Sequence, residues 1–221
     1  LTRWAGYLAS AGLCVVSIDY RLAPQTCYPD SFQDCLDAID YVADHAAEFH
    51  LNADRLGLWG DSAGGHLVLL AATSQTRPEI CGPRLRCGGD CLRGVVAWYP
   101  PTDLIALHEV ERRAHDGPSM VSSFAGVEPS QDMARWEAIS PIRQLHPATP
   151  PSLILQGTGD VLVPKDQATR YAARAEEVGA VVELHLVEGA PHGLDRVAPG
   201  AEARGLIERS RSFLLEQLAQ A

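Results

Sequence analysis

The sequence predicts an α/β fold in which helices flank a mostly parallel sheet. Two observations predict it: short apolar segments alternate with helical ones along the chain, and the first apolar segment is nearly continuous. A continuous apolar run is typical of a strand buried on both faces, as in a parallel sheet covered by helices. The 221 residues are enough for one domain with a sizeable core, so we expect a single domain over residues 1–221.

Two helices and two strands are predicted before residue 60. Residues 2–11 have a helical pattern that ends at Gly12, because glycine readily ends a helix. Leu13–Ile18 is the nearly continuous apolar run and the first predicted strand. A second helix is predicted over residues 30 to about 50, where apolar residues recur at the spacing of one helical face. Arg55–Trp59 is the second predicted strand.

The rest of the chain continues the alternation. Further strands are predicted over residues 94–99, 152–156 and 181–187. Pro164 and Gly179 mark the limits of a helix over 165–178, since proline favours a helix start and glycine a helix end. A last helix has the inner face Ala203, Leu206, Ile207, Ser210, Phe213 and Leu214. Residues 100–150 are rich in proline, serine and charge, which predicts a lid or insertion within the domain.

Composition excludes some partners. The formal charge of −10 argues against nucleic acid or an anionic membrane surface, and no basic stripe overrides it. No apolar run approaches the roughly 18 residues that a membrane-spanning helix needs. No signal peptide is visible, which favours the cytoplasm, but the first residue is Leu1 and an upstream signal peptide stays open.

The six cysteines do not form a metal-binding pattern. They are Cys14, Cys27, Cys35, Cys81, Cys87 and Cys91. The last three cluster, but without a C-x-x-C pair or a nearby histidine, so no zinc site is predicted. A chain of this size does not need disulfides, so we expect reduced, non-catalytic thiols. A bridge within residues 81–91 is the alternative.

The strongest local signal is Gly60-Asp61-Ser62-Ala63-Gly64-Gly65, between an apolar strand and an apolar helix. This G-x-S-x-G pattern predicts a sharp strand-to-helix turn that projects the serine hydroxyl above the sheet edge. The glycines let strand and helix approach closely, and the helix N-terminus directs N–H groups to where negative charge develops. Ser62 is therefore the candidate nucleophile.

A serine nucleophile needs a base, and His192 is the candidate. It lies in Gly189-Ala190-Pro191-His192-Gly193, a loop after the last predicted strand, from which it can reach the carboxyl edge of the sheet. A solvated loop histidine is the alternative. His66 lies one helical turn past Ser62 and cannot readily reach back over it. The remaining candidates lie in the predicted lid or within a strand, namely His108, His115, His146 and His185.

Asp160 is the candidate acid that orients the base. It follows the fourth predicted strand, 160 − 62 = 98 residues after Ser62 and 192 − 160 = 32 residues before His192. Its place agrees with the chain order serine, acid, histidine that accompanies such a turn. Asp166 is better explained as stabilising the dipole of the following helix, and Asp195 is too close to His192.

A family resemblance extends over nearly the whole chain. Its motifs are Ser17-Ile18-Asp19-Tyr20-Arg21-Leu22-Ala23-Pro24, GDSAGG at 60–65, Tyr99-Pro100-Pro101-Thr102-Asp103, Gly159-Asp160 with Val163-Pro164, and Pro191-His192-Gly193. Together they resemble the hormone-sensitive-lipase-like esterases and the related feruloyl- and acetyl-esterase-like and arylformamidase-like branch. The resemblance implies an α/β-hydrolase fold and a carboxylic-ester hydrolase for small or medium acyl esters. It implies a Ser62–Asp160–His192 triad, the N–H of Ala63 in the oxyanion hole, and no metal or organic cofactor.

Contacts to the small-molecule ester are less defined. Asp61, Tyr99 and Trp136 are the candidate substrate-binding residues. Tyr99 and Trp136 could line an acyl pocket beside residues 100–150, or they could be ordinary core or lid packing. Asp61, beside the nucleophile, could instead brace the turn or serve as a structural hydrogen bonder. Whether the chain forms a homo-oligomer stays open.

Two other functions remain open. Gly159-Asp160 with Val163-Pro164 also resembles the catalytic domain of prolyl-oligopeptidase-type enzymes, which would make the chain an amide or peptide hydrolase. Against this, Ala63 stands where that family usually has an aromatic residue. A non-catalytic interaction protein on a hydrolase scaffold is the second alternative.

One part of the family pattern has no match. The resembling esterases carry an HGGG-type loop upstream of the segment matching residues 13–24, and that loop supplies half of the oxyanion hole. No such motif occurs in residues 1–221, so we expect a fold that is incomplete at its N-terminus. We expect residues 1–221 alone to fold poorly or act weakly, and a stable, fully active preparation would refute this.

Overall fold

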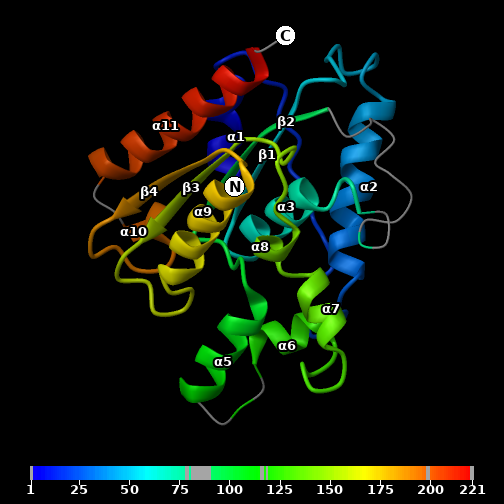
Figure 1. The fold of residues 1–221 in the computed structure, drawn as a ribbon. Coiled ribbons are helices and arrows are strands. Elements are labelled where there is room, and N and C mark those ends of the chain that lie inside the picture. The colour runs from blue at the N-terminus through cyan, green and yellow to red at the C-terminus, as the bar shows by residue number, and fades with distance from the viewer. Residues whose placement is uncertain are drawn as a thin grey trace.

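The computed structural model describes residues 2–77, 80, 91–114, 117, 119–197 and 200–219. Within these residues, four strands form one sheet in the order β1-β2-β3-β4 (Figure 1). They are β1 (Leu56–Asp61), β2 (Leu92–Trp98), β3 (Ser152–Gly157) and β4 (Val182–Val187). All three pairings are parallel. The predicted parallel α/β architecture is confirmed.

The carboxyl ends of the strands lie at one edge of the sheet. Asp61, the last residue of β1, is opposite Trp98, the last residue of β2. Gly157 at the end of β3 is likewise opposite Val187 at the end of β4. The segments that follow the strands therefore start from a common edge, although they are far apart in the sequence.

Helices cover both faces of the sheet. α3 (Ala63–Thr73) and α9 (Asp166–Val178) pack on the face that presents Val95 and Ala97, whereas α11 (Gly200–Ala219) packs on the face of Val96 and Trp98. Successive residues of a strand point to opposite faces, so neighbouring residues of β2 contact different helices. Gly179 ends α9 with a φ of 78°, as predicted.

Two more helices precede β1 in the chain. They are α1 (Thr2–Ala9) and α2 (Asp30–Asp44). α1 is shorter than predicted, and its chain turns at Gly12 with a φ of 87°. α2 ends at Asp44 instead of about residue 50, because the following residues form turns that close at His50 with a positive φ of 54°.

Four helices lie between β2 and β3 among the residues of 100–150 that the structure describes. They are α5 (Leu104–Ala114), α6 (Met120–Ala125), α7 (Met133–Ala138) and α8 (Pro141–Gln144). α5, α6 and α7 lie together at the lower end of the view in Figure 1, far from α11. Gln167 of α9 holds the start of this segment, because its Oε1 accepts hydrogen bonds from the N–H groups of Thr102 and Asp103 at 2.8 and 2.7 Å. That this segment acts as a lid stays a prediction.

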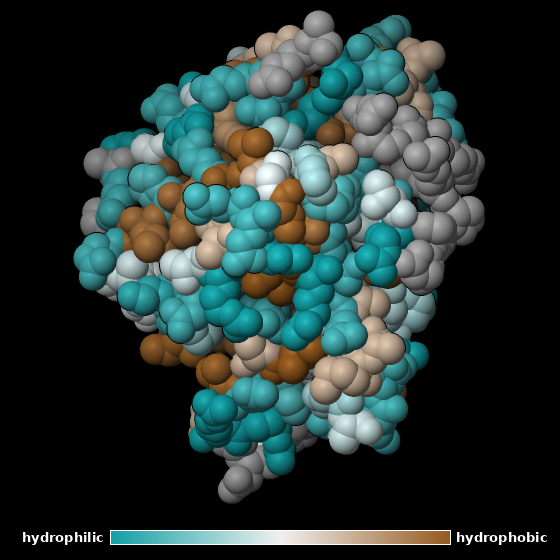
Figure 2. All heavy atoms as spheres, viewed as in Figure 1, coloured by the Kyte–Doolittle hydropathy of each residue, from teal (hydrophilic) through white to brown (hydrophobic). Residues whose placement is uncertain are grey.

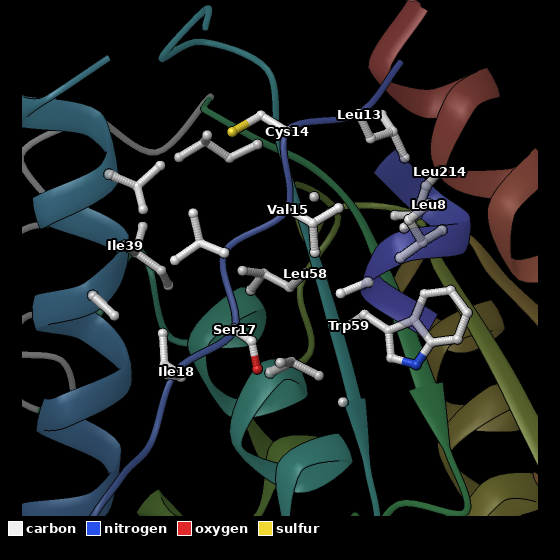
Figure 3. A pocket seen from close by; sticks show the side chains of 18 of the residues that line it. Leu8, Leu13, Cys14, Val15, Ser17, Ile18, Ile39, Leu58, Trp59 and Leu214 are labelled. Carbon is white, nitrogen blue, oxygen red and sulfur yellow. The ribbon is translucent and has the colours of Figure 1, made fainter. Parts of the chain in front are cut away.

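The prediction of a strand over Leu13–Ile18 is wrong. The segment is extended, but a strand requires a partner, and within the described residues 13–18 form no backbone–backbone hydrogen bond. A cavity of about 810 Å³ separates it from β1. Figure 3 shows Val15 and Ser17 running beside Leu58 and Trp59, between α2 and Leu214 of α11.

The expectation of reduced cysteines holds at three positions and is wrong at one. Cys14, Cys27 and Cys35 are free thiols. Cys91 is disulfide-bonded, so the clustered cysteines are not all reduced. Cys81 and Cys87 lie outside the described residues, as does His115.

The face of the molecule in view in Figure 2 is mostly hydrophilic. Figure 2 shows hydrophilic residues over most of one face, with apolar residues in smaller patches between them. Among the described helices, none combines the length and the apolar character that crossing a membrane requires.

Candidate active site

Ser62 lies in the sharp turn between β1 and α3, as predicted. Its backbone has a φ of 53° and a ψ of −118°, which is uncommon for a residue with a side chain and typical of strained functional positions. A Cβ atom at Gly60 would lie only 2.2 Å from the carbonyl oxygen of Gly64, so the tight turn requires glycine there. The N–H of Ser62 donates to the carbonyl of Trp98 at 2.9 Å, which ties the turn to β2.

The structure places the three residues predicted for nucleophile, base and acid next to one another. The Oγ of Ser62 lies 2.9 Å from Nε2 of His192, and Nδ1 of His192 lies 2.7 Å from Oδ2 of Asp160. Asp160 has a fully buried side chain, whereas the side chain of His192 is 21% exposed. The contacts therefore run from a buried carboxylate to a partly exposed serine.

Four hydrogen bonds hold the carboxylate of Asp160. Oδ1 accepts from the N–H groups of Leu162 and Val163 at 3.0 and 2.9 Å, and Oδ2 accepts from His192 and from Nε2 of Gln156. Burial raises the pKa of Asp160, but the hydrogen bonds from His192, Val163 and Leu162 outweigh it and leave the pKa below its ordinary value of 3.8. An ionised Asp160 accepts from Nδ1–H, which leaves the lone pair of Nε2 facing the hydroxyl of Ser62.

Glycines allow the loop of the acid to touch the loop of the base. A Cβ atom at Gly157 would lie 2.1 Å from the carbonyl oxygen of Ala190, and one at Gly159 would lie 2.7 Å from that of Gly189. The N–H of Gly159 donates to the Ala190 carbonyl at 3.0 Å. Backbone contact between these loops thus sets the separation of Asp160 and His192.

The other predicted site residues occupy different environments. Ala63 is the first residue of α3, so its N–H is one of the helix N-terminal donors without an intrahelical acceptor. Tyr99 is 1% exposed and its ring contacts the ring of His192. The Oδ2 of Asp61 accepts a long hydrogen bond of 3.4 Å from the Tyr99 hydroxyl and lies 4.0 Å from Nη2 of Arg196.

Trp136 lies in the packing between helices α5 and α7. It is fully buried, its Nε1 donates to the carbonyl of Val127 at 3.1 Å, and its ring packs edge-to-face on His108. This position favours the packing interpretation that the sequence left open.

A family model described as BD-FAE matches residues 2–174 of the chain. The chain belongs to the BD-FAE family. The resemblance to the esterase branch of the α/β-hydrolases is thereby confirmed.

Curated relatives of this BD-FAE chain are named as ester hydrolases. Esterase LipQ of Mycobacterium tuberculosis (strain ATCC 25618 / H37Rv) is 27% identical over 211 residues, which cover 94% of this chain and 48% of LipQ. Ethyl acetate hydrolase of Pseudomonas putida is 29% identical over 196 residues, which cover 85% of this chain and 58% of the hydrolase. The chain therefore spans about half the length of these relatives.

Solved structures agree on the fold. A truncated form of a carbohydrate esterase from gut microbiota superposes with a TM-score of 0.80 at 24% identity, covering 96% of this chain and 77% of that one. The carboxylesterase Cest-2923 from Lactobacillus plantarum WCFS1 has a TM-score of 0.77 at 22% identity, covering 100% and 80%. At these identities the similarity establishes the fold alone, which is that of the α/β-hydrolases.

Gln156 is a residue of this BD-FAE site that sequence reasoning missed. It is the penultimate residue of β3 and fully buried, and its Nε2 donates to Oδ2 of Asp160 at 3.2 Å and to the carbonyl of Val163 at 3.0 Å. The sequence offered one signal, an amide inside an otherwise apolar strand. A buried amide needs partners, and here the acid provides one of them.

His66 does not reach the nucleophile, as predicted. Its Nδ1 lies 3.2 Å from the carbonyl of Pro101, and its ring packs edge-to-face on Phe124 of α6. Burial lowers the pKa of His66 to about 4, against a weaker opposing effect of the Pro101 carbonyl. His66 is thus a neutral residue that joins α3 to the helices of residues 100–150.

We expect His66 to make the fold sensitive to mild acid. At pH values between its ordinary pKa of 6.5 and its folded pKa of about 4, this histidine is protonated in the unfolded chain and neutral in the folded chain. The free energy of unfolding should therefore fall as the pH drops through this window, by a total on the order of 3 kcal/mol. Urea unfolding of the wild type and His66→Gln at several pH values measures the effect.

The His66→Gln variant should have a flatter pH dependence than the wild type. His185→Gln, on an exposed position of β4, is the matched control and should keep the wild-type slope. A His66 ring that titrates near 6.5 in NMR spectra would contradict this prediction.

Proposed function

We propose that this BD-FAE chain is the catalytic part of a serine carboxylesterase that hydrolyses small or medium acyl esters. The observation that carries the proposal is the continuous contact from Asp160 through His192 to Ser62, with distances of 2.7 and 2.9 Å. These are the spacings at which a base takes a proton from a serine while an acid orients the base.

The proposed reaction proceeds in two acyl transfers. Nε2 of His192 takes the hydroxyl proton as Oγ of Ser62 attacks the ester carbonyl, and Asp160 stabilises the imidazolium that forms. The leaving alcohol departs with the proton from His192, which gives an acyl-serine. Water then attacks the acyl carbon, loses its proton to His192, and releases the acid as Ser62 regains its proton.

The N–H of Ala63 is the proposed donor to the oxyanion. Two features support it: the residue directly follows the nucleophile, and its N–H belongs to the helix N-terminus, where partial positive charge is concentrated. Each such donor contributes several kcal/mol in enzymes of this kind, about 3–4 kcal/mol when one is removed.

Small and medium acyl esters are the proposed substrates. The name of one relative, ethyl acetate hydrolase, supports a short acyl group, and an acetyl esterase of Salmonella choleraesuis (strain SC-B67) is 35% identical over 88 residues, which cover 40% of this chain and 25% of that esterase. We also propose that residues 100–150 form a lid within the single domain. The support for it is that His66, one turn beyond the nucleophile, packs on Phe124 of this segment.

Reaction with a fluorophosphonate probe tests the proposal. The wild type should be labelled, and Ser62→Ala should not be, because the probe reacts with an activated serine oxygen. Ser10→Ala is the control, since the Ser10 hydroxyl is engaged at the end of α1 with the carbonyl of Tyr7 and should not affect labelling. Absence of labelling in the full-length protein would favour the scaffold alternative.

Parallel assays separate the hydrolase alternatives. We expect turnover of p-nitrophenyl acetate to exceed that of N-formylkynurenine and of a prolyl amide. A preference for N-formylkynurenine would favour an arylformamidase-like enzyme, and a preference for the prolyl amide would favour a peptide hydrolase.

A further inference from the structure

Tyr99 occupies the position between the nucleophile and the acid at the sheet edge. β2 lies between β1 and β3 in the sheet, and Tyr99 directly follows its last residue, Trp98. The N–H of Tyr99 donates to the carbonyl of Leu155 in β3 at 2.7 Å. The carbonyl of Trp98 accepts from the N–H of Ser62 in turn. The backbone of Tyr99 is therefore fixed to both neighbouring strands.

The conformation of Tyr99 is one that a tyrosine rarely adopts. Its φ is 40°, and among the described residues the other non-glycine positions with positive φ are His50 and Ser62. Such a conformation disfavours a bulky side chain and persists only where surrounding contacts enforce it. Since Tyr99 is 1% exposed, these contacts hold its ring inside the protein.

The ring of Tyr99 packs against the imidazole of the candidate base. The two ring centroids lie 4.7 Å apart with an interplanar angle of 64°, an edge-to-face arrangement. The Tyr99 hydroxyl lies 3.4 Å from Oδ2 of Asp61, which is long for a hydrogen bond between oxygens. The contact between the Tyr99 hydroxyl and Asp61 is therefore a weak one.

His192 needs such a contact during the proposed reaction. Its loop is bounded by Gly189 and Gly193, with φ values of 69° and 73°. Because glycine has no side chain, these two residues do little to restrict the orientation of His192. When Nε2 carries the proton from Ser62 to the leaving oxygen, its bond to Ser62 is lost. The hydrogen bond to Asp160 then remains to oppose rotation of the imidazole about its Cα–Cβ and Cβ–Cγ bonds.

We propose that Tyr99 is a positioning residue, whose ring blocks this rotation and keeps Nε2 of His192 aimed at the reacting atoms. The inference rests on the proposed function, and it gives Tyr99 a role through the base instead of direct contact with the substrate. Asp61 supports the role by accepting from the Tyr99 hydroxyl beside the turn of Ser62.

Tyr99→Leu tests the role, because it removes the ring and keeps an apolar side chain. We expect kcat on p-nitrophenyl acetate to fall about tenfold while KM stays within about twofold. Tyr99→Phe keeps the ring and should retain most of the wild-type kcat. If Tyr99→Leu does not fold, Tyr99→Met provides the same test with a more adaptable side chain.

Tyr41 provides a matched control. Its ring also stacks on a histidine, His45, at 4.0 Å, but on the exposed side of α2. Tyr41→Leu should leave kcat and KM unchanged. A rise in KM at constant kcat in Tyr99→Leu would indicate substrate contact and overturn the positioning role, as would an unchanged kcat.

NMR spectra of the His192 ring separate failure of this inference from failure of the proposed function. Tyr99→Leu should broaden or multiply the His192 ring signals relative to the wild type, and one sharp set of signals overturns the positioning role. A wild type that neither hydrolyses esters nor reacts with fluorophosphonate overturns the proposed function, whatever the state of the His192 signals.

Discussion

Asp160→Asn is expected to lower kcat about 10⁴-fold without unfolding the protein. The reason is the fixed orientation of the carboxylate. Its Oδ1 accepts from the N–H groups of Leu162 and Val163, so the single oxygen of asparagine must occupy that place. The amide nitrogen then faces Nδ1 of His192, which becomes an acceptor, and the ring proton moves to Nε2. A protonated Nε2 cannot take the proton of Ser62.

The effect is measured as kcat on p-nitrophenyl acetate together with the urea midpoint of unfolding. Asp166→Asn is the matched control, because Asp166 is the neighbouring aspartate, exposed in the first turn of α9. It should retain wild-type activity. A kcat of Asp160→Asn within about tenfold of the wild type would assign the orienting role to another group.

Gly157→Ala is expected to lower kcat by about a hundredfold, although the residue contacts no substrate. Its new methyl group would lie 2.1 Å from the carbonyl oxygen of Ala190, which is backbone and cannot swing away. The loop that carries His192 must therefore move away from β3. A displacement of about 1 Å at the base is enough for a loss of this size.

Gly205→Ala is the control for the chemical change itself. Gly205 lies within α11, and a Cβ atom there would meet nothing within 4 Å. This variant should keep full activity and gain slightly in stability, since alanine is the better helix former. Equal activity of Gly157→Ala and Gly205→Ala would show that the two loops adjust freely to each other.

Short-range patterns in the sequence were enough to predict the turn that carries the candidate nucleophile. The glycines at 60, 64 and 65 indicated a turn at Ser62, and the structure needs glycine at 60 because α3 starts against the backbone of β1. Parallel strands have their carboxyl ends at one edge, so the segments after 61, 157 and 187 could be expected to meet. This topological rule allowed Asp160 and His192 to be selected from several acids and histidines.

The tertiary structure alone decided which groups have partners. Leu13–Ile18 has the composition of a buried strand, yet it lies across a cavity from β1, because strand pairing depends on what stands beside the segment. Neighbouring segments also decide the different environments of two buried aromatic residues. Trp136 is enclosed among helices, whereas the ring of Tyr99 contacts His192. The sequence by itself determined the layered architecture and the residues proposed for catalysis, since both follow from short-range patterns and chain order. Burial, ring contacts and the carboxylate's four hydrogen bonds depend on distant segments, and they became visible only once the chain was folded.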